Sequence, residues 1–161
     1  MVFDHIEEKE AVKKAALIER NGIAFYTLMA EKITDERIRP VLKRLASDEK
    51  RHLKVIEEKF FEEAGFGEVI DEEELEIEEY VERLGTPDIF TRRINIEKLV
   101  SAIDEPRKAL ILAMNTERHS VEFFESMAGK AATEDGKKMY RELAEEERGH
   151  VRHIEDLLRL V

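Results

Sequence analysis

Cysteine and tryptophan are both absent from this chain of 161 residues, and glycine and proline are scarce, with 7 and 3 residues. The absence of cysteine excludes disulfide bonds, iron–sulfur clusters and thiol catalysis within the sequence. Few residues interrupt helices, and no stretch rich in Val, Ile and Thr alternates as a strand does. The composition and its pattern therefore predict an all-α protein.

Long apolar runs and clustered positive charge are also missing. No run approaches the roughly 20 apolar residues that a membrane-spanning helix needs. Residues 1–8 lack the basic and then apolar stretches of a secretory signal, which favours the cytoplasm. The formal net charge of −11 argues against nucleic acid and anionic membranes as partners, because contacts to phosphate groups require clustered Lys and Arg.

Four long helices are predicted, at residues 4–32, 35–64, 104–130 and 133–160. The last three begin at residues that commonly cap helices, namely Asp35, Asp104 and Thr133, although Pro40 lies just past the first turn of the second helix. Links of only a few residues join the first helix to the second and the third to the fourth. Such short links make the joined helices antiparallel, so we expect two helical hairpins.

The two hairpins are separated by residues 65–103, which are acidic over residues 71–80. Short helices are predicted within this segment at residues 73–84 and 96–102. The segment is long enough to cross from one end of a bundle to the other. The expected architecture is a single domain over residues 1–161, an antiparallel four-helix bundle with a long crossover between its second and third helices.

One pattern of glutamate and histidine occurs twice. It is a glutamate followed 30 residues later by Glu-x-x-His, and its two copies are offset by 98 residues. The residues concerned are Glu19, Glu49 and His52 in the first copy, and Glu117, Glu147 and His150 in the second. A duplicated hairpin predicts a bundle with approximate two-fold symmetry, in which equivalent side chains surround a common centre.

The sequence around these six residues predicts that they are buried. Residues three or four positions apart share one face of a helix, and the stripe through each proposed ligand is otherwise apolar. A carboxylate that is buried without a partner costs several kcal/mol or takes up a proton, so four of them at one level of a core demand cations. The alternative is that they are ordinary exposed charges, which leaves the equal spacings and the interrupted stripes unexplained.

Mixed carboxylate and imidazole donors suit a pair of iron or manganese ions, and zinc is a competitor for the same ligands. Each ion could take one histidine and one terminal glutamate, and two further carboxylates could bridge the ions. A dinuclear metal site, with iron as the favoured metal, is therefore the leading hypothesis for the function of this chain.

The sequence resembles the ferritin-like di-iron superfamily and, within it, the rubrerythrin group. Residues 19–26 (Glu-Arg-Asn-Gly-Ile-Ala-Phe-Tyr) and 117–124 (Glu-Arg-His-Ser-Val-Glu-Phe-Phe) carry this resemblance together with the repeated motif. It implies a ferritin-like bundle in which Glu19 and Glu117 are terminal ligands, Glu49 and Glu147 bridge the metals, and His52 and His150 complete one metal each.

The resemblance also gives Tyr26 a role, as the donor of a hydrogen bond to a ligand carboxylate across the bundle. The alternative for Tyr26 is a core aromatic residue at the edge of the apolar stripe. Phe124 occupies the equivalent position in the second half and has no hydroxyl group to donate. Of the other histidines, we expect His119 and His153 to lie on the surface.

Two features depart from the rubrerythrin pattern. Rubrerythrins typically carry an extra glutamate three residues after the ligand of the third helix, where this chain has Ser120. They typically also carry a cysteine-rich, rubredoxin-like domain that delivers electrons, whereas this chain has no cysteine. Turnover would therefore need an external electron donor such as a rubredoxin-like protein, and these departures weigh against peroxide reduction.

The functional hypothesis is an oxidoreductase whose two iron ions react with H₂O₂ or O₂, a peroxidase or ferroxidase for defence against oxidative stress or for iron handling. The first alternative is a non-catalytic metal-binding or iron-storage bundle. The second is a structural bundle whose site holds zinc or stays empty. We expect a homodimer, with exchange of hairpins through the crossover as a variant of it.

Overall fold

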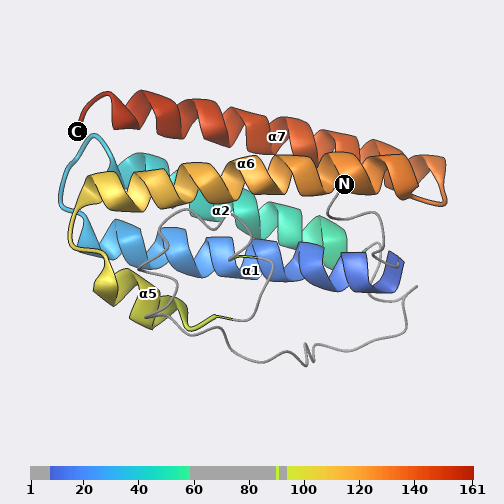
Figure 1. Ribbon diagram of the computed structural model, residues 1–161, viewed down its shortest axis with the longest axis horizontal. Coiled ribbons are helices and arrows are strands. Elements are labelled where there is room, and N and C mark those ends of the chain that lie inside the picture. The colour runs from blue at the N-terminus through green and yellow to red at the C-terminus, as the bar shows by residue number, and fades with distance from the viewer. Residues whose placement is uncertain (1–7, 59–89, 91–93) are drawn as a thin grey trace.

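The computed structural model describes residues 8–58, 90 and 94–161, and its helices are connected in the order that Figure 1 shows. The helices are α1 (Glu8–Lys32), α2 (Arg39–Ile56), α5 (Ile96–Ala102), α6 (Pro106–Lys130) and α7 (Glu134–Leu158). No strand occurs among the described residues. Nor is any helix in this part of the chain long and apolar enough to cross a membrane.

The four long helices form two hairpins, α1 with α2 and α6 with α7, which lie side by side in one bundle (Figure 1). The end of α2 lies at the opposite end of the bundle from the start of α6 (Figure 1). The all-helical, ferritin-like bundle with a long crossover is confirmed.

The second long helix begins later than the sequence analysis predicts. Residues 36–38 form a turn, and α2 starts at Arg39 with Pro40 in its first turn. The reason is the proline: it has no N–H to donate inside a helix, but the first turn does not need that donor. Asp35 therefore does not cap the helix and instead accepts a hydrogen bond from the Arg37 backbone N–H at 2.8 Å.

The third long helix also begins at a proline, while the start of the fourth is confirmed. Glu105 precedes Pro106 as the N-terminal boundary residue of α6, so Asp104 is not the cap and accepts from Lys108 Nζ at 2.8 Å instead. At the start of α7, the side chain of Thr133 accepts from the Gly136 N–H at 3.0 Å, as a capping threonine does.

The short helix predicted at residues 96–102 is present with those bounds as α5. Asn95 caps it by accepting from the Lys98 N–H at 3.0 Å. Lys32 Nζ, at the end of α1, donates to the carbonyl groups of Val100 and Ile103 and so joins α1 to the end of α5. The other predicted short helix, at residues 73–84, lies outside the described residues, as do residues 4–7 and 59–64 of the first two predicted helices.

The crossover is fastened to the first hairpin at Phe90. Asn21 Nδ2 donates a hydrogen bond to the Phe90 carbonyl oxygen at 2.9 Å, and the rings of Phe25 and Phe90 meet edge to face with centroids 5.6 Å apart. An apolar contact and a buried hydrogen bond thus hold the chain just before α5 against α1.

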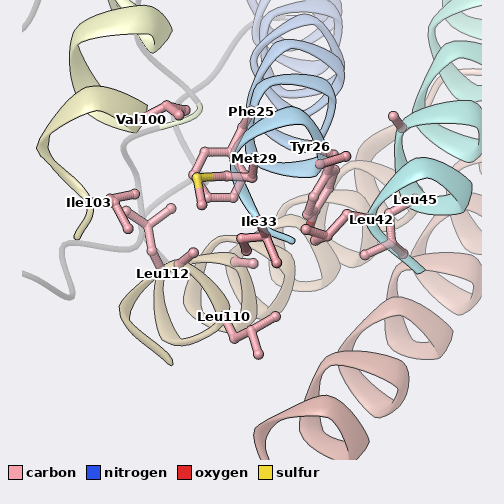
Figure 2. Packing of buried hydrophobic residues seen from close by; sticks show 14 of the residues in the cluster. Phe25, Tyr26, Met29, Ile33, Leu42, Leu45, Val100, Ile103, Leu110 and Leu112 are labelled. Atoms are coloured by element: carbon pink, nitrogen blue, oxygen red, sulfur yellow. The ribbon is translucent and has the colours of Figure 1, made fainter. Parts of the chain in front are cut away.

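Two apolar clusters fill the bundle, one on each side of a polar layer. The α5-side cluster is shown in part in Figure 2, where side chains of α1, α2, α5 and α6 meet; it includes Phe25, Met29, Leu42, Leu45, Leu99 and Leu110. The far cluster includes Val12, Ala15, Phe123, Phe124, Met139 and Leu143. Along each long helix, the proposed ligands fall between the residues of one cluster and those of the other.

The duplication seen in the sequence extends to the ion pairs on the outside of each hairpin. In the first hairpin, Arg20 of α1 donates to Glu57, the residue that directly follows α2, at 3.1 Å. In the second hairpin, Arg118 of α6 donates to Glu155 of α7 at 3.0 Å. These pairs are related by the same offset of 98 residues as the Glu-x-x-His motifs. The two hairpins therefore place equivalent residues at equivalent depths.

Candidate metal centre

The structure brings all six proposed ligands together in the middle of the bundle. α1 and α6 each supply one glutamate, and α2 and α7 each supply a glutamate and a histidine. All six are buried, with exposed fractions between 0% and 4%; they are Glu19, Glu49, His52, Glu117, Glu147 and His150. A set of charged and polar side chains this deep in a core needs partners of opposite charge.

The six residues form two groups, and in each group one ligand atom per residue lies within 4.8 Å of the others. Glu49 and Glu147 belong to both groups. The first group adds Glu19 and His52, and the second adds Glu117 and His150. Two cation positions that share a pair of carboxylates are thus compatible with the side chains as they stand.

Both imidazole rings turn their Nδ1 atoms toward the centre. His52 Nδ1 lies 3.0 Å from a Glu147 oxygen and 3.6 Å from one oxygen each of Glu19 and Glu49. His150 Nδ1 lies 3.0 Å from Glu49, 3.1 Å from Glu147 and 3.4 Å from Glu117. The rings stack with centroids 5.8 Å apart and planes inclined by 17°.

The outer ring nitrogens meet two carboxylates that the sequence analysis missed. His52 Nε2 lies 2.6 Å from Glu146, and His150 Nε2 lies 3.1 Å from Asp48. Each contact joins α2 to α7, so no pattern within one helix reveals it. The available signal was the duplication, since each carboxylate directly precedes a ligand glutamate and the two are offset by 98 residues.

These outer carboxylates fix the protonation of the rings. A carboxylate at Nε2 keeps the proton on that nitrogen, which leaves Nδ1 available as a metal ligand. The hydrogen bonds from Arg51 to Glu146 hold the pKa of this carboxyl at about 2, well below its usual range. Glu146 therefore remains an anion and a hydrogen-bond acceptor at neutral pH.

The carboxylates at the centre have unused oxygens. Both oxygens of Glu19 and Oε2 of Glu117 are buried and accept no hydrogen bond, and Oε1 of Glu49 has only His150 Nδ1 near it, at 3.0 Å. A buried polar atom left in this way costs about 1–3 kcal/mol, and more when it is charged. Cations bound between the carboxylates would remove that cost, so the residues present fit a pair of divalent metal ions.

Protons take the place of metal charge in the metal-free protein. Burial alone would lower the pKa of His52, but the hydrogen bonds and charges of Glu147 and Glu49 outweigh it and raise the pKa to about 11. The carboxylates around His150 likewise raise its pKa against the effect of burial. Burial, and then the charge of Glu147, raise the pKa of Glu117 to about 7.

Tyr26 makes the hydrogen bond that the resemblance implies. Its hydroxyl donates to Glu117 Oε1 at 2.5 Å, from α1 to α6 across the core, and both groups are buried. Burial and the charge of Glu117 raise the pKa of Tyr26, so the phenol keeps its proton. The equivalent Phe124 donates nothing toward Glu19, which makes the two halves of the site unequal.

Small residues lie one turn beyond the ligands of α1 and α6. A Cβ atom added at Gly22 would lie 3.4 Å from Glu49 Cγ, at ordinary contact distance, so Gly22 lies directly beside this glutamate. The equivalent residue in the second half is Ser120, whose hydroxyl donates to the Thr116 carbonyl oxygen of its own helix at 2.9 Å. No fifth carboxylate therefore joins the four ligand glutamates at this place.

One prediction about the remaining histidines is wrong. His119 is buried, because α6 buries a second stripe beside that of Glu117, which includes Leu112, Thr116, His119, Phe123 and Ser126. His153 is exposed, as predicted. His5 lies outside the described residues.

Comparison with known proteins supports the fold and the family. A hypothetical protein from Pyrococcus furiosus has a TM-score of 0.69 and 20% identity, over 95% of this chain and 89% of that chain. A DUF305 fragment from Deinococcus radiodurans has a TM-score of 0.67 and 14% identity, over 96% of this chain and 98% of that one. No curated protein matches this chain.

The identity to both solved structures is low, so they show a shared fold alone. The family follows from a sequence model instead. The model of the rubrerythrin family matches residues 10–158, nearly the whole chain and all four long helices, and this chain therefore belongs to the rubrerythrin family.

Proposed function

We propose that this chain binds two iron ions in the centre of the bundle and uses them to reduce H₂O₂ or O₂, as a peroxidase or ferroxidase. The observation that carries the proposal is the convergence of six buried glutamate and histidine side chains, in which several of the carboxylate oxygens accept no hydrogen bond. Carboxylate and imidazole ligands together suit iron, and membership of the rubrerythrin family favours the same metal.

Charge balance supports two ions rather than one. Four ionised glutamates carry as much negative charge as two divalent ions carry positive charge, with both histidines neutral. With a single ion, protons on the histidines would have to balance the remaining negative charge, and a doubly protonated imidazole cannot bind a metal ion. The buried carboxylates are thus matched to a pair of Fe²⁺ ions.

The proposed ligand roles follow from the two groups. Glu49 and Glu147, which belong to both groups, would be shared by the two ions. Glu19 with His52 completes one ion, and Glu117 with His150 completes the other. Tyr26 is not a ligand; its hydroxyl holds the carboxylate of Glu117 in one orientation.

Bound iron would supply the electrons that reduce the oxidant. The protein would hold the two ions in place and exclude water from them. The apolar clusters on either side keep the site dry, so the interactions between the ions and their ligands are not weakened by solvent. Because the sequence has no cysteine to hold an electron-transfer centre, we propose that electrons arrive from an external donor such as a rubredoxin-like protein.

The test is consumption of oxidant by iron-loaded protein. Wild type is compared with Glu49→Gln and Glu147→Gln, which remove bridging charges at little change in shape. Glu142→Gln, at an exposed position on α7, is the matched control. We expect wild type and the control to consume H₂O₂ or O₂ in proportion to bound iron, and both bridging variants to lose most of this activity. Equal activity in all four proteins would contradict the proposal.

The alternative is a bundle that binds metal without catalysis, since the same donors also accept Mn²⁺ or Zn²⁺. It predicts stoichiometric metal binding and no consumption of oxidant. That residues 1–161 form one domain, and that the protein is a homodimer, stay predictions, and the mass of the protein in solution tests the second.

A further inference from the structure

One arginine, Arg51, contacts the outer carboxylate partners of both histidines. The Arg51 guanidinium donates to both oxygens of Glu146, at 3.1 and 2.8 Å, and Nη2 lies 3.5 Å from Asp48 Oδ1. These are the carboxylates that contact Nε2 of His52 and of His150. One side chain thus touches the outer partners of both imidazoles.

The contacts form a continuous path between α2 and α7. It runs from His52 to Glu146, from there to Arg51 and Asp48, and ends at His150. Each outer carboxylate uses one oxygen for its histidine. Asp48 turns its other oxygen to the arginine, and Glu146 offers the arginine both of its oxygens.

This bridge belongs to one half of the duplicated chain. The residue equivalent to Arg51 in the second Glu-x-x-His motif is Gly149, so no second arginine comes from that position. A feature of one hairpin therefore serves both ligand groups. The six proposed ligands are related by the duplication, whereas the arginine outside them is present in the first hairpin alone.

The bridge matters because the outer carboxylates are partly exposed. The side chains of Asp48 and Glu146 are 27% and 39% exposed, so water competes with the imidazoles for their oxygens. Without Arg51, both acids would be free to rotate toward solvent and exchange the contact with Nε2 for contacts with water. The guanidinium opposes that rotation, and its planar fork matches the two oxygens of Glu146.

We propose that Arg51 is a positioning residue for both metal positions, which holds Glu146 and Asp48 on the two imidazoles so that each presents Nδ1 to its metal ion. The inference rests on the proposed function, because it takes His52 and His150 as metal ligands. It goes beyond that function by assigning a role in binding to an exposed arginine that is not itself a ligand.

The experiment is an anaerobic titration of the metal-free protein with Co²⁺, in which calorimetry measures the affinity for each ion. Arg51→Ala removes the bridge, and Arg51→Lys keeps the charge without the fork. Arg118→Ala is the matched control, because Arg118 is 54% exposed against 55% for Arg51 and pairs with Glu155, which is neither a proposed ligand nor a partner of His52 or His150. Loss of a partner that orients ligands typically lowers metal affinity about 10- to 100-fold, and we expect Arg51→Ala to show this for both ions.

A second readout separates positioning from mere stability. In Co²⁺-loaded wild type, the Nε2 protons of the two histidines give paramagnetically shifted resonances that disappear in D₂O. We expect both to broaden in Arg51→Ala through faster exchange with water, to be partly retained in Arg51→Lys, and to stay sharp in Arg118→Ala. The thermal stability of the metal-free variants should differ little, since the arginine is exposed.

The outcomes are distinct. Weakened binding of both ions with loss of both resonances supports the inference. Wild-type affinity and sharp resonances in Arg51→Ala would overturn the inference and leave the proposed function standing. An effect on one ion alone would overturn the claim that Arg51 serves both positions. Failure of wild type to bind Co²⁺ would overturn the proposed function and the inference together.

Discussion

The hydrogen bond from Tyr26 to Glu117 should contribute measurably to stability, in a way that depends on pH. Tyr26→Phe deletes one hydroxyl group and leaves the ring. Phe124, at the equivalent place in the other half, shows that a phenyl ring is accommodated in such a position without exposure. The variant therefore tests the hydrogen bond at 2.5 Å with little change in packing.

The magnitude follows from the charge of the acceptor. A hydrogen bond to a charged group contributes about 1.5–3 kcal/mol. Oε2 of Glu117 accepts no hydrogen bond, so the variant also removes the hydroxyl donor from its other oxygen, Oε1. The pKa of Glu117 is about 7 in the metal-free protein. At pH 8 the carboxylate is ionised and we expect the full loss in the free energy of unfolding. At pH 5 it is protonated and the loss should be smaller.

The assay is urea denaturation of metal-free wild type and Tyr26→Phe at both pH values. Tyr140→Phe, which deletes the hydroxyl of another buried tyrosine in the far cluster, is the control for losing a buried hydroxyl group in general. A loss for Tyr26→Phe that is the same at pH 5 and pH 8, or no loss at all, would refute the reasoning.

Three further predictions concern the protons and the space in the site. The pKa of His52 is raised from 6.5 to about 11, so its protonation stabilises the folded state fully below pH 6.5, and this stabilisation is lost as the pH rises toward 11. The raised pKa of Glu117 likewise makes the free energy of unfolding fall as the pH rises. Thermal unfolding should therefore show the metal-free protein weakening above pH 7 and bound metal stabilising it more at higher pH. Binding of two divalent ions at pH 7 should release between two and three protons, one from each imidazole and about half a proton from Glu117, whose pKa is about 7; calorimetry in buffers of different ionisation enthalpy would measure this number. Gly22→Ala should leave metal affinity close to that of wild type, because the added Cβ would lie 3.4 Å from Glu49 Cγ, at ordinary contact distance; Gly129→Ala, with open space around it, should also leave affinity unchanged and should stabilise α6 by about 0.5–1 kcal/mol.

Much of the site was predictable because its sequence signals lie within single helices. The spacing of Glu-x-x-His places both side chains on one helix face, and the offset of 98 residues relates the hairpins, so the convergence of the six side chains follows from topology. The bounds of α5 and the cap at Thr133 were likewise predictable from local residues. These features can be predicted without knowing which helices pack against each other.

What could not be predicted depends on contacts between helices or on competing local preferences. Asp48 and Glu146 acquire their role only when α2 and α7 pack together. His119 is buried because α6 presents a broader buried face than the stripe of Glu117. At two helix starts a capping aspartate competed with a nearby proline, and the proline decided where the helix begins, since its missing N–H suits the first turn alone.

The central claim is that the bundle holds two metal ions in one buried carboxylate and histidine site. Its most direct test is anaerobic titration of the metal-free protein with Fe²⁺, followed by equilibrium dialysis to count the iron retained. The account predicts two Fe²⁺ per chain in wild type and a clear loss in Glu49→Gln and Glu147→Gln. Absence of stoichiometric binding in wild type, or two ions retained in both variants, would contradict it.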